Sequence, residues 1–228
     1  MSDISPSPVA EATRGTLADL RMDYHHAELI ESDLLEDPIA QFDLWMTEAR
    51  TMHRPGMDEP HAMTLATATA EGIPSARTVL LKGVDERGFT WFTNYESRKG
   101  HELAANAYAA LNFRWGALER QVVVTGSVTR VSAEESDEYF YSRPLASRIG
   151  AIVSAQSTAV SRSALEAAAA VWADQPESAV VRPTHWGGYR LDPVWIEFWQ
   201  GRSSRLHDRL RFCRDAVDAP WTLERLAP

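Results

Sequence analysis

The chain has 228 residues, 44% of them hydrophobic, which is enough for one globular domain with a sizeable core. Its formal net charge of −9 argues against nonspecific nucleic-acid binding, because a phosphate backbone would repel it at long range. The single cysteine, Cys213, excludes an internal disulfide and a cysteine-based metal site.

The N-terminal segment predicts a leader ahead of the domain. Ser, Pro, Ala and Thr dominate its start, so we expect residues 1–19 to be disordered and residues 20–228 to form a single domain. Arg21 and Tyr24 follow in a short charged segment, which by itself predicts a surface tether. No apolar run approaches the ~20 residues of a membrane span, and no signal peptide is evident. We therefore expect a soluble, cytoplasmic protein.

The first half of the chain predicts one helix followed by strands. Asp37-Pro38 opens the helix as an N-cap with proline at the first helical position, and Pro55-Gly56 ends it. Strand-like runs separated by turn signals then cover residues 62–69, 76–84, 89–93, 109–115 and 121–131. Short strands with tight turns and few crossover helices predict a mainly β, antiparallel barrel with flanking helices.

The second half alternates helices with closing strands. Ser97 is the N-cap of a helix to Asn106, and Ser132-Ala-Glu-Glu135 is a capping box that opens the next one. Further helices are expected at 145–153 and 161–173, and strands at 186–192, 194–200, 206–214 and 221–226.

Basic residues in the first turn of the Ser97 helix suggest an anion site. Arg98 and Lys99 oppose the helix dipole, at a cost of about 0.3–1 kcal/mol each at low salt. An anion bound at the helix start would reverse that balance. A solvated basic face is the alternative that the spacing alone favours.

Tyr139, Arg143 and Ser147 recur every four residues. They would share one helix face, as a cradle for a phosphate ester, if helical geometry continued through Pro144. A surface Tyr/Arg pair explains the spacing equally well. Similarly, Arg77 and Lys82 lie at the two ends of an apolar strand. Their long side chains could simply extend along the apolar surface and keep their charges in water.

The run from residue 205 to residue 211 would, as a strand, place Arg205, His207 and Arg209 on one face. Such a row suits an anionic or electron-rich ligand, although a solvated edge strand is about as probable from spacing alone. We find no convincing metal site and no Gly-x-Gly-x-x-Gly fingerprint of a dinucleotide site.

From about Leu20 to Pro228 the chain resembles the pyridoxamine 5′-phosphate oxidases, flavin enzymes that make pyridoxal 5′-phosphate. The C-terminal signature comprises Trp-Gly-Gly-Tyr-Arg at 186–190, Glu-Phe-Trp-Gln-Gly at 197–201 and Arg-Leu-His-Asp-Arg at 205–209. The blocks ahead of it are Arg77-Thr-Val-Leu-Leu-Lys82, Thr93-Asn94, Ser97-Arg98-Lys99, Leu118-Glu-Arg-Gln121, Tyr139 with Ser142-Arg143-Pro144, and Gln156-Ser157.

The resemblance implies an FMN-binding split β-barrel of antiparallel, Greek-key type, which forms a homodimer with its sites at the subunit interface. It implies noncovalent FMN, pyridoxamine or pyridoxine 5′-phosphate as substrate, and O2 as the acceptor that yields H2O2. The FMN residues it implies are Arg77, Thr78, Val79, Leu80, Leu81, Lys82, Phe92, Thr93, Arg98, Lys99, Gln121, Gln156, Ser157, Trp199 and Arg209. The substrate residues it implies are Arg21, Tyr24, Lys82, Tyr139, Arg143, Ser147, Arg205 and His207, of which Arg205 and His207 are the catalytic pair.

Proteins with related sequences have two other functions, which are the alternatives here. A sister flavin oxidase of the phenazine pathway shares the fold and parts of the C-terminal signature. A non-catalytic split-barrel protein could instead bind flavin, haem or pyridoxal phosphate. Retention of Lys82, Tyr139, Arg143 and Ser147 argues against both.

Overall fold

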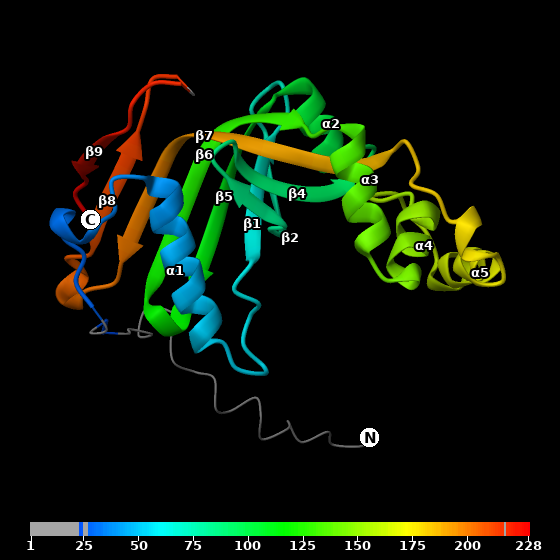
Figure 1. The fold of residues 1–228 in the computed structure, drawn as a ribbon, viewed down its shortest axis with the longest axis horizontal. Coiled ribbons are helices and arrows are strands. Elements are labelled where there is room, and N and C mark those ends of the chain that lie inside the picture. Colours follow the sequence, from blue (N-terminus) through cyan, green and yellow to red (C-terminus); the bar gives the residue numbers. More distant parts are fainter. Residues whose placement is uncertain (1–22, 25–26, 217) are drawn as a thin grey trace, which may run out of the picture.

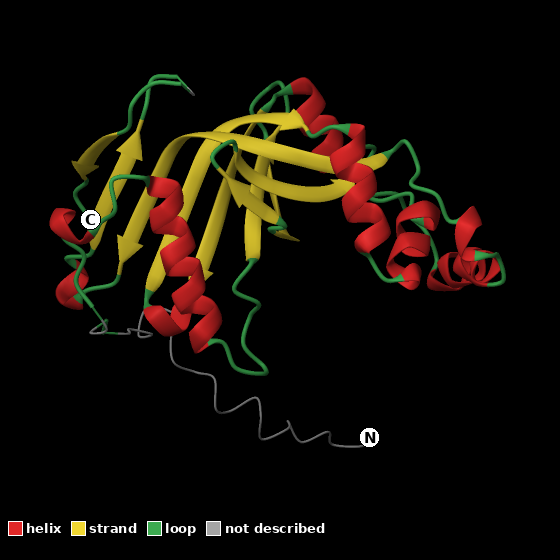
Figure 2. Ribbon diagram, in the orientation of Figure 1, coloured by secondary structure: helices red, strands yellow, loops and turns green. Residues whose placement is uncertain are grey.

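One antiparallel sheet carries the fold, with helices around it (Figures 1 and 2). The computed structural model describes residues 23–24, 27–216 and 218–228, so the predicted leader and Arg21 lie outside the described part. The strands are β1 (Ala62–Ala68), β2 (Pro74–Leu80), β3 (Gly83–Asp85), β4 (Gly88–Asn94), β5 (Tyr108–Trp115), β6 (Arg120–Arg130), β7 (Trp186–Gln200), β8 (Asp208–Cys213) and β9 (Thr222–Arg225). The α-helices are α1 (Pro38–Met52), α2 (Arg98–Ala105), α3 (Ala133–Ser142), α4 (Leu145–Val153) and α5 (Arg162–Ala173).

The sheet curls back on itself, which confirms the predicted antiparallel barrel. Its main path runs β2-β1-β5-β6-β7-β4-β3, and β8 and β9 extend it from β7. The two end strands of that path, β2 and β3, are consecutive in the chain.

The predicted single strand 76–84 is wrong, because β2 ends at Leu80 and β3 begins at Gly83. The Leu81 amide donates to His61 O and the Lys82 amide to Thr90 O, so the chain changes partner between the two strands.

The predicted pair of strands at 186–192 and 194–200 is in fact one strand, β7. Asp192-Pro193 does not end it, because the irregularity is absorbed by a bulge in the pairing with β6. Thr125 lies opposite Trp195 and Gly126 opposite Pro193, so Val194 is the extra residue. A Cβ on Gly126 would lie 2.0 Å from the Asp192 carbonyl oxygen, which explains the glycine.

The core lies between α1 and the sheet. Phe42 of α1 is fully buried, and its ring centroid lies 4.9 Å from those of Phe89 and of Phe113. Trp45, one turn later, packs edge-on against Phe198 of β7 at 5.1 Å. The helix therefore covers one face of the barrel with the aromatic stripe that its sequence period predicts.

The predicted N-caps are confirmed, but the capping box at Ser132 is only half formed, because the Glu135 carboxylate accepts from Arg87 and Arg190. The Asp37 side chain accepts from the Ile39 amide, Ser97 from Gly100 and Ser132 from Glu135. Helix α3 ends at Ser142, and Arg143 is extended, with φ −81° and ψ 149°, because Pro144 disfavours the helical conformation in the residue before it. The condition of a continuous helix through Pro144 is thus not met.

Candidate active site

A cavity of about 870 Å³ lies among β2, β4, α2, α3 and α4. Its wall includes five cationic side chains and, among the described residues, no carboxylate. This is notable in a chain of net charge −9, because a wall with an excess of positive charge favours an anionic ligand. Glu102, behind the wall, pairs with two of the five cations, Arg77 and Arg98. The cations are Arg77, Lys82, Arg98, Lys99 and Arg143.

The N-terminus of α2 forms one side of the cavity. Lys99 is buried there, and its ammonium donates to Gln156 Oε1 at 2.7 Å, Ser97 Oγ at 2.9 Å and Thr93 Oγ1 at 3.1 Å. Burial, and secondarily the positive charge of Arg77, lowers the pKa of Lys99 to about 8. Ser157 accepts from the Arg98 amide at 3.1 Å and has a left-handed backbone, with φ 76°. A non-glycine residue held in that region is typical of binding sites.

The edge of β2 forms a second wall. This strand pairs with β1 and ends the main path of the sheet, so its other edge offers backbone amides and carbonyls to the cavity. Residues 75–80 all contribute to the wall, among them Arg77, Thr78, Val79 and Leu80. Leu81 is instead buried in the hydrophobic core.

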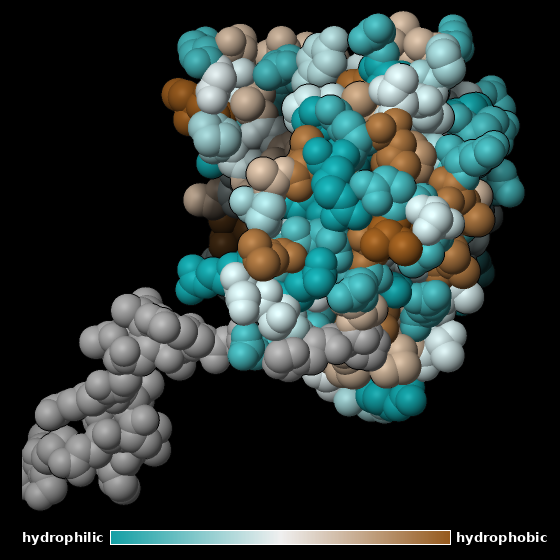
Figure 3. All heavy atoms as spheres, turned by 90° about the vertical axis from the view of Figure 1, so that its left-hand side faces the viewer, coloured by the Kyte–Doolittle hydropathy of each residue, from teal (hydrophilic) through white to brown (hydrophobic). Residues whose placement is uncertain are grey.

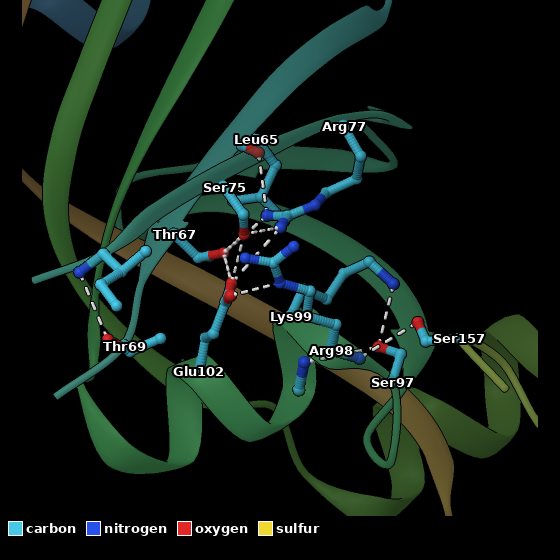
Figure 4. A network of polar contacts seen from close by, with 12 residues as sticks. Leu65, Thr67, Thr69, Ser75, Arg77, Ser97, Arg98, Lys99, Glu102 and Ser157 are labelled. Carbon is cyan, nitrogen blue, oxygen red and sulfur yellow. Dashed lines mark hydrogen bonds and ion pairs between the residues drawn. The ribbon is translucent and has the colours of Figure 1, made fainter. Parts of the chain in front are cut away.

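Figure 4 shows how Arg77 is held. Its guanidinium donates to Leu65 O at 3.0 Å, to Thr67 Oγ1 at 2.6 Å and to Ser75 Oγ. Glu102 of α2 lies behind these groups, and accepts from Arg98 Nε at 2.8 Å. Sequence reasoning missed Glu102, because nothing in the pattern of α2 distinguishes it from a surface glutamate.

The third wall brings Tyr139, Arg143 and Ser147 together despite the break at Pro144. The Arg143 guanidinium lies 4.7 Å from the centroid of the Trp186 ring, and its buried Nη1 has no hydrogen-bond partner. Burial lowers the pKa of Arg143. A buried, unpaired guanidinium nitrogen is costly unless an acceptor arrives, so this group is suited to a bound anion.

Trp186 also lines the cavity, which its place in the Trp-Gly-Gly-Tyr-Arg signature does not by itself predict. The rings of Phe92, Tyr139 and Trp186 are nearly parallel and stack against one another, with centroids 4.1 Å apart for Phe92–Tyr139, 5.7 Å for Phe92–Trp186 and 6.2 Å for Tyr139–Trp186. The glycines that follow Trp186 are the signal that could have identified it. A Cβ on Gly187 would lie 2.1 Å from the Tyr95 hydroxyl, so this close packing requires glycine.

The remaining predicted residues form a second cluster, far from the cavity. Gln121, Trp199 and Arg209 lie directly opposite one another on β6, β7 and β8, and therefore share one face. The His207 ring lies 4.7 Å from Trp199, and Tyr24 lies 5.6 Å from His207. Arg209 pairs with Glu197 at 2.8 Å.

The predicted strand through Arg205 is wrong. Residues 203–205 form a 3-10 turn in which Ser204 and Arg205 have left-handed φ of 56° and 61°, and β8 begins only at Asp208. Arg205 is exposed, and the side chain of His207 is fixed by a local bond, because its Nδ1 accepts from the Arg202 amide at 3.1 Å. Strand alternation therefore does not relate these two residues to Arg209.

The two groups of residues stand at opposite ends of β7 (Figure 1). Trp186 lines the cavity and Trp199 belongs to the second cluster. At about 3.3 Å per residue, they are on the order of 40 Å apart along the strand. Among the described residues, the cavity wall includes none of the second cluster. One chain alone therefore does not bring both groups to one ligand.

The cavity fits FMN. Its volume lies within the range of small-molecule sites, Arg77, Arg98 and Lys99 are suited to a phosphate monoester, and the free edge of β2 is suited to a planar heterocycle.

In the described part of the chain, no group of three or more His, Cys, Asp or Glu side chains could hold a metal ion, and no helix is long and apolar enough to cross a membrane.

Comparisons with known proteins agree with this geometry. Residues 50–176 match the family model described as pyridoxamine 5′-phosphate oxidase, and residues 186–228 match the pyridoxine 5′-phosphate oxidase C-terminal dimerisation region, which supports a homodimer. The chain is 59% identical over 215 residues to the pyridoxine/pyridoxamine 5′-phosphate oxidase of Burkholderia orbicola (strain MC0-3), covering 93% of this chain and 99% of the relative. The protein of the same name from Herminiimonas arsenicoxydans is 53% identical over 214 residues, covering 93% of this chain and 100% of the relative.

Solved structures share the fold. PhzG from Burkholderia lata 383, in complex with tetrahydrophenazine-1-carboxylic acid, superimposes with a TM-score of 0.79 at 31% identity, covering 90% of this chain and 100% of that one. An FMN-binding protein from Nostoc punctiforme has a TM-score of 0.67 at 15% identity, covering 86% and 100%. The chain therefore belongs to the pyridoxamine 5′-phosphate oxidase family, has its FMN-binding split-barrel fold and takes FMN as its cofactor.

Proposed function

We propose that this protein is an FMN-dependent oxidase that makes pyridoxal 5′-phosphate. Pyridoxine 5′-phosphate and O2 would give pyridoxal 5′-phosphate and H2O2. Pyridoxamine 5′-phosphate, O2 and water would give the same aldehyde, H2O2 and ammonia. FMN, held by the cations at α2 and β2, would supply the two-electron redox chemistry between the substrate and O2.

The observation that carries this proposal is the buried Nη1 of Arg143, which has no hydrogen-bond partner, in a cavity wall without carboxylates among the described residues. A flavin phosphate would occupy the cations at α2 and β2, and the second set, Tyr139, Arg143 and Ser147, is suited to another phosphate ester. Lys82 lies on the β2 side and would contact both ligands. Two anion sites in one cavity fit a phosphorylated substrate beside FMN.

We further propose that each site is completed by a second copy of the chain. The second cluster, including Trp199, His207 and Arg209, lies within the matched dimerisation region but away from its own cavity. Figure 3 shows the face that carries β8 and β9, where hydrophobic and hydrophilic side chains lie side by side. From the partner, Trp199 and Arg209 would contact the flavin, while Arg205 and His207 would orient the substrate ring.

The direct test of activity uses the purified holoprotein in air. Pyridoxamine 5′-phosphate should yield equal amounts of aldehyde and H2O2, and dephosphorylated pyridoxamine should be a far poorer substrate. Failure to form aldehyde from either phosphorylated substrate would contradict the proposal.

Shared sites are tested by mixing two impaired variants, Arg143→Ala and Arg205→Ala, and by assaying at a substrate concentration below the wild-type KM, where each variant alone has little activity. Random reassociation makes half of the dimers heterodimers with one intact site of two, so activity should recover to about a quarter of the wild-type value. Absence of recovery, with heterodimers verified by differential tagging, would mean that each site uses residues of one chain.

The similarity to PhzG favours one alternative, oxidation of a phenazine precursor. Tetrahydrophenazine-1-carboxylic acid carries a carboxylate and no phosphate. Its carboxylate would also pair with Arg143, so only the substrate assay separates the two functions. Turnover of that compound, together with inactivity on both phosphorylated substrates, would favour the alternative.

A further inference from the structure

We propose that Glu102 is a positioning residue for cofactor binding: its carboxylate orients Arg77 and Arg98 toward the FMN phosphate. The inference rests on the proposed assignment of these two arginines to that phosphate. It makes a counterintuitive prediction, namely that removing a negative charge beside an anion site weakens binding of the anion.

Glu102 stands behind the cavity wall. It lies one helical turn after Arg98 on α2, and its side chain is only 5% exposed. Arg77, Arg98 and Ser75 line the cavity, whereas Glu102 does not. The carboxylate therefore touches the residues assigned to the ligand from the protein side (Figure 4).

Each carboxylate oxygen of Glu102 holds a different part of the wall. Oε1 accepts from Arg98 Nε at 2.8 Å. Oε2 accepts from Ser75 Oγ at 2.6 Å and from Thr67 Oγ1, and lies 3.4 Å from Arg77 Nη2. One side chain thus links the first turn of α2 to strands β1 and β2.

The two hydroxyls pass this constraint on to Arg77. Thr67 and Ser75 each have one hydroxyl proton, which they donate to Glu102, and both accept from the Arg77 guanidinium. Every proton in the network therefore has a fixed direction. A glutamine at position 102 would replace one of the two acceptor oxygens by an NH2 donor. If that NH2 faces Arg98, the bond to Arg98 is lost; if it faces Ser75 and Thr67, the bonds from these two hydroxyls are lost.

Glu102 is charged at every working pH. Burial alone would raise its pKa, but hydrogen bonds from Ser75, Thr67 and Arg98, together with the Arg98 charge, lower it to about 2. The carboxylate has two effects of opposite sign on a bound phosphate: it repels the anion, and it orients the cations that bind it. Orientation should dominate, because the Arg98 side chain is 60% exposed and would otherwise have to be immobilised by the ligand itself.

The test is Glu102→Gln, with flavin affinity of the apoprotein measured by fluorescence quenching for FMN and for riboflavin, which lacks the phosphate. We expect the Kd for FMN to rise about tenfold, equivalent to about 1.4 kcal/mol, and the Kd for riboflavin to stay within about twofold. Glu96→Gln is the matched control. It removes the same charge from an exposed residue just before α2, and should leave FMN affinity unchanged or slightly higher.

An unchanged or tighter FMN affinity for Glu102→Gln would overturn the inference, since Glu102 would then act only as a nearby charge. An equal loss for both flavins, with a lower Tm of the apoprotein, would also overturn it by indicating a purely structural role. Should Glu102→Gln fail to fold, Ser75→Ala breaks one relay while keeping the carboxylate, and should show a smaller loss selective for FMN.

The underlying phosphate assignment is tested separately with Arg77→Ala and Arg98→Ala. If these variants keep the wild-type preference for FMN over riboflavin, the assignment in the proposed function fails. If they lose that preference while Glu102→Gln retains it, only the role of Glu102 fails.

Discussion

Replacing Arg143 by alanine should separate substrate binding from cofactor binding. The guanidinium has a buried nitrogen without a partner and no carboxylate near it in the cavity wall, so its binding capacity is unused in the free chain. A hydrogen bond to a charged group contributes about 1.5–3 kcal/mol, so KM for pyridoxamine 5′-phosphate should rise about 10- to 100-fold. FMN content should be unchanged.

The stability of this variant should hardly change, which distinguishes it from an ordinary buried-arginine mutant. Loss of the contact with Trp186, 4.7 Å away, costs about 0.5–1 kcal/mol. Removal of an unpaired buried donor offsets that loss. Thermal unfolding should therefore give nearly the wild-type Tm.

The assay is steady-state kinetics with FMN absorbance measured on the same preparation, and inorganic phosphate as a competitive inhibitor. Phosphate should inhibit the parent and have less effect on Arg143→Ala. Arg162→Ala, at an exposed arginine of α5, is the control and should behave as the parent. Unaltered KM, or loss of flavin from Arg143→Ala, would refute the assignment of this cradle to the substrate.

Three further predictions use other parts of the structure. Because the pKa of Lys99 is lowered to about 8, the FMN affinity of the apoprotein should fall as pH rises through 8, and Lys99→Met should remove this dependence. Lysine in the unfolded chain keeps its proton up to about pH 10.5, so Lys99 should also make the apoprotein more stable as pH rises from about 8 to about 10.5. A free energy of unfolding in urea that does not change over this pH range would contradict the second expectation. Arg205→Ala and His207→Ala should keep FMN and the dimer yet lose catalytic efficiency, whereas Arg209→Ala should release FMN more readily; parental turnover in the first two would remove them from the site. Gly126→Ala should destabilise the fold by more than about 2 kcal/mol in urea unfolding, since its Cβ would meet the Asp192 carbonyl, whereas Gly116→Ala, with open space around it, should change stability by less than about 0.5 kcal/mol.

Local chemistry explains which elements could be predicted from the sequence. The starts of α1, α2 and α3 follow from Asp37, Ser97 and Ser132, because each cap is satisfied within three residues of its own chain. The ends of β7 could not be predicted in this way. Pro193 is tolerated within the strand because of a bulge opposite Gly126, some 70 residues earlier, and a sequence window around Pro193 does not contain that partner.

The residues of the candidate site also fall into two groups, those that the local sequence indicates and those that only the folded chain brings together. Arg98 and Lys99 conflict with the dipole of their own helix, so the role proposed for them in an anion site can be inferred from the local sequence. Glu102 is visible only once α2 lies against β1 and β2, because Thr67 and Ser75 are distant in sequence. The alternation predicted for Arg205 failed, because the left-handed residues at 204 and 205 turn the chain before β8 begins.

Strand β7 couples the two halves of the proposed site. Its first residue, Trp186, lines the cavity, and Trp199 near its end belongs to the cluster assigned to the partner's site. Side chains alternate between faces along a strand, so one extra residue reverses the face of everything beyond it. Val194, opposite the Gly126 bulge, is that residue. The bulge therefore determines that Trp199 faces the same side as Gln121, and a β6–β7 pairing without it would turn this indole toward the core, where Phe198 now packs against Trp45. Arg209 shares that side because it lies directly opposite Trp199 on β8.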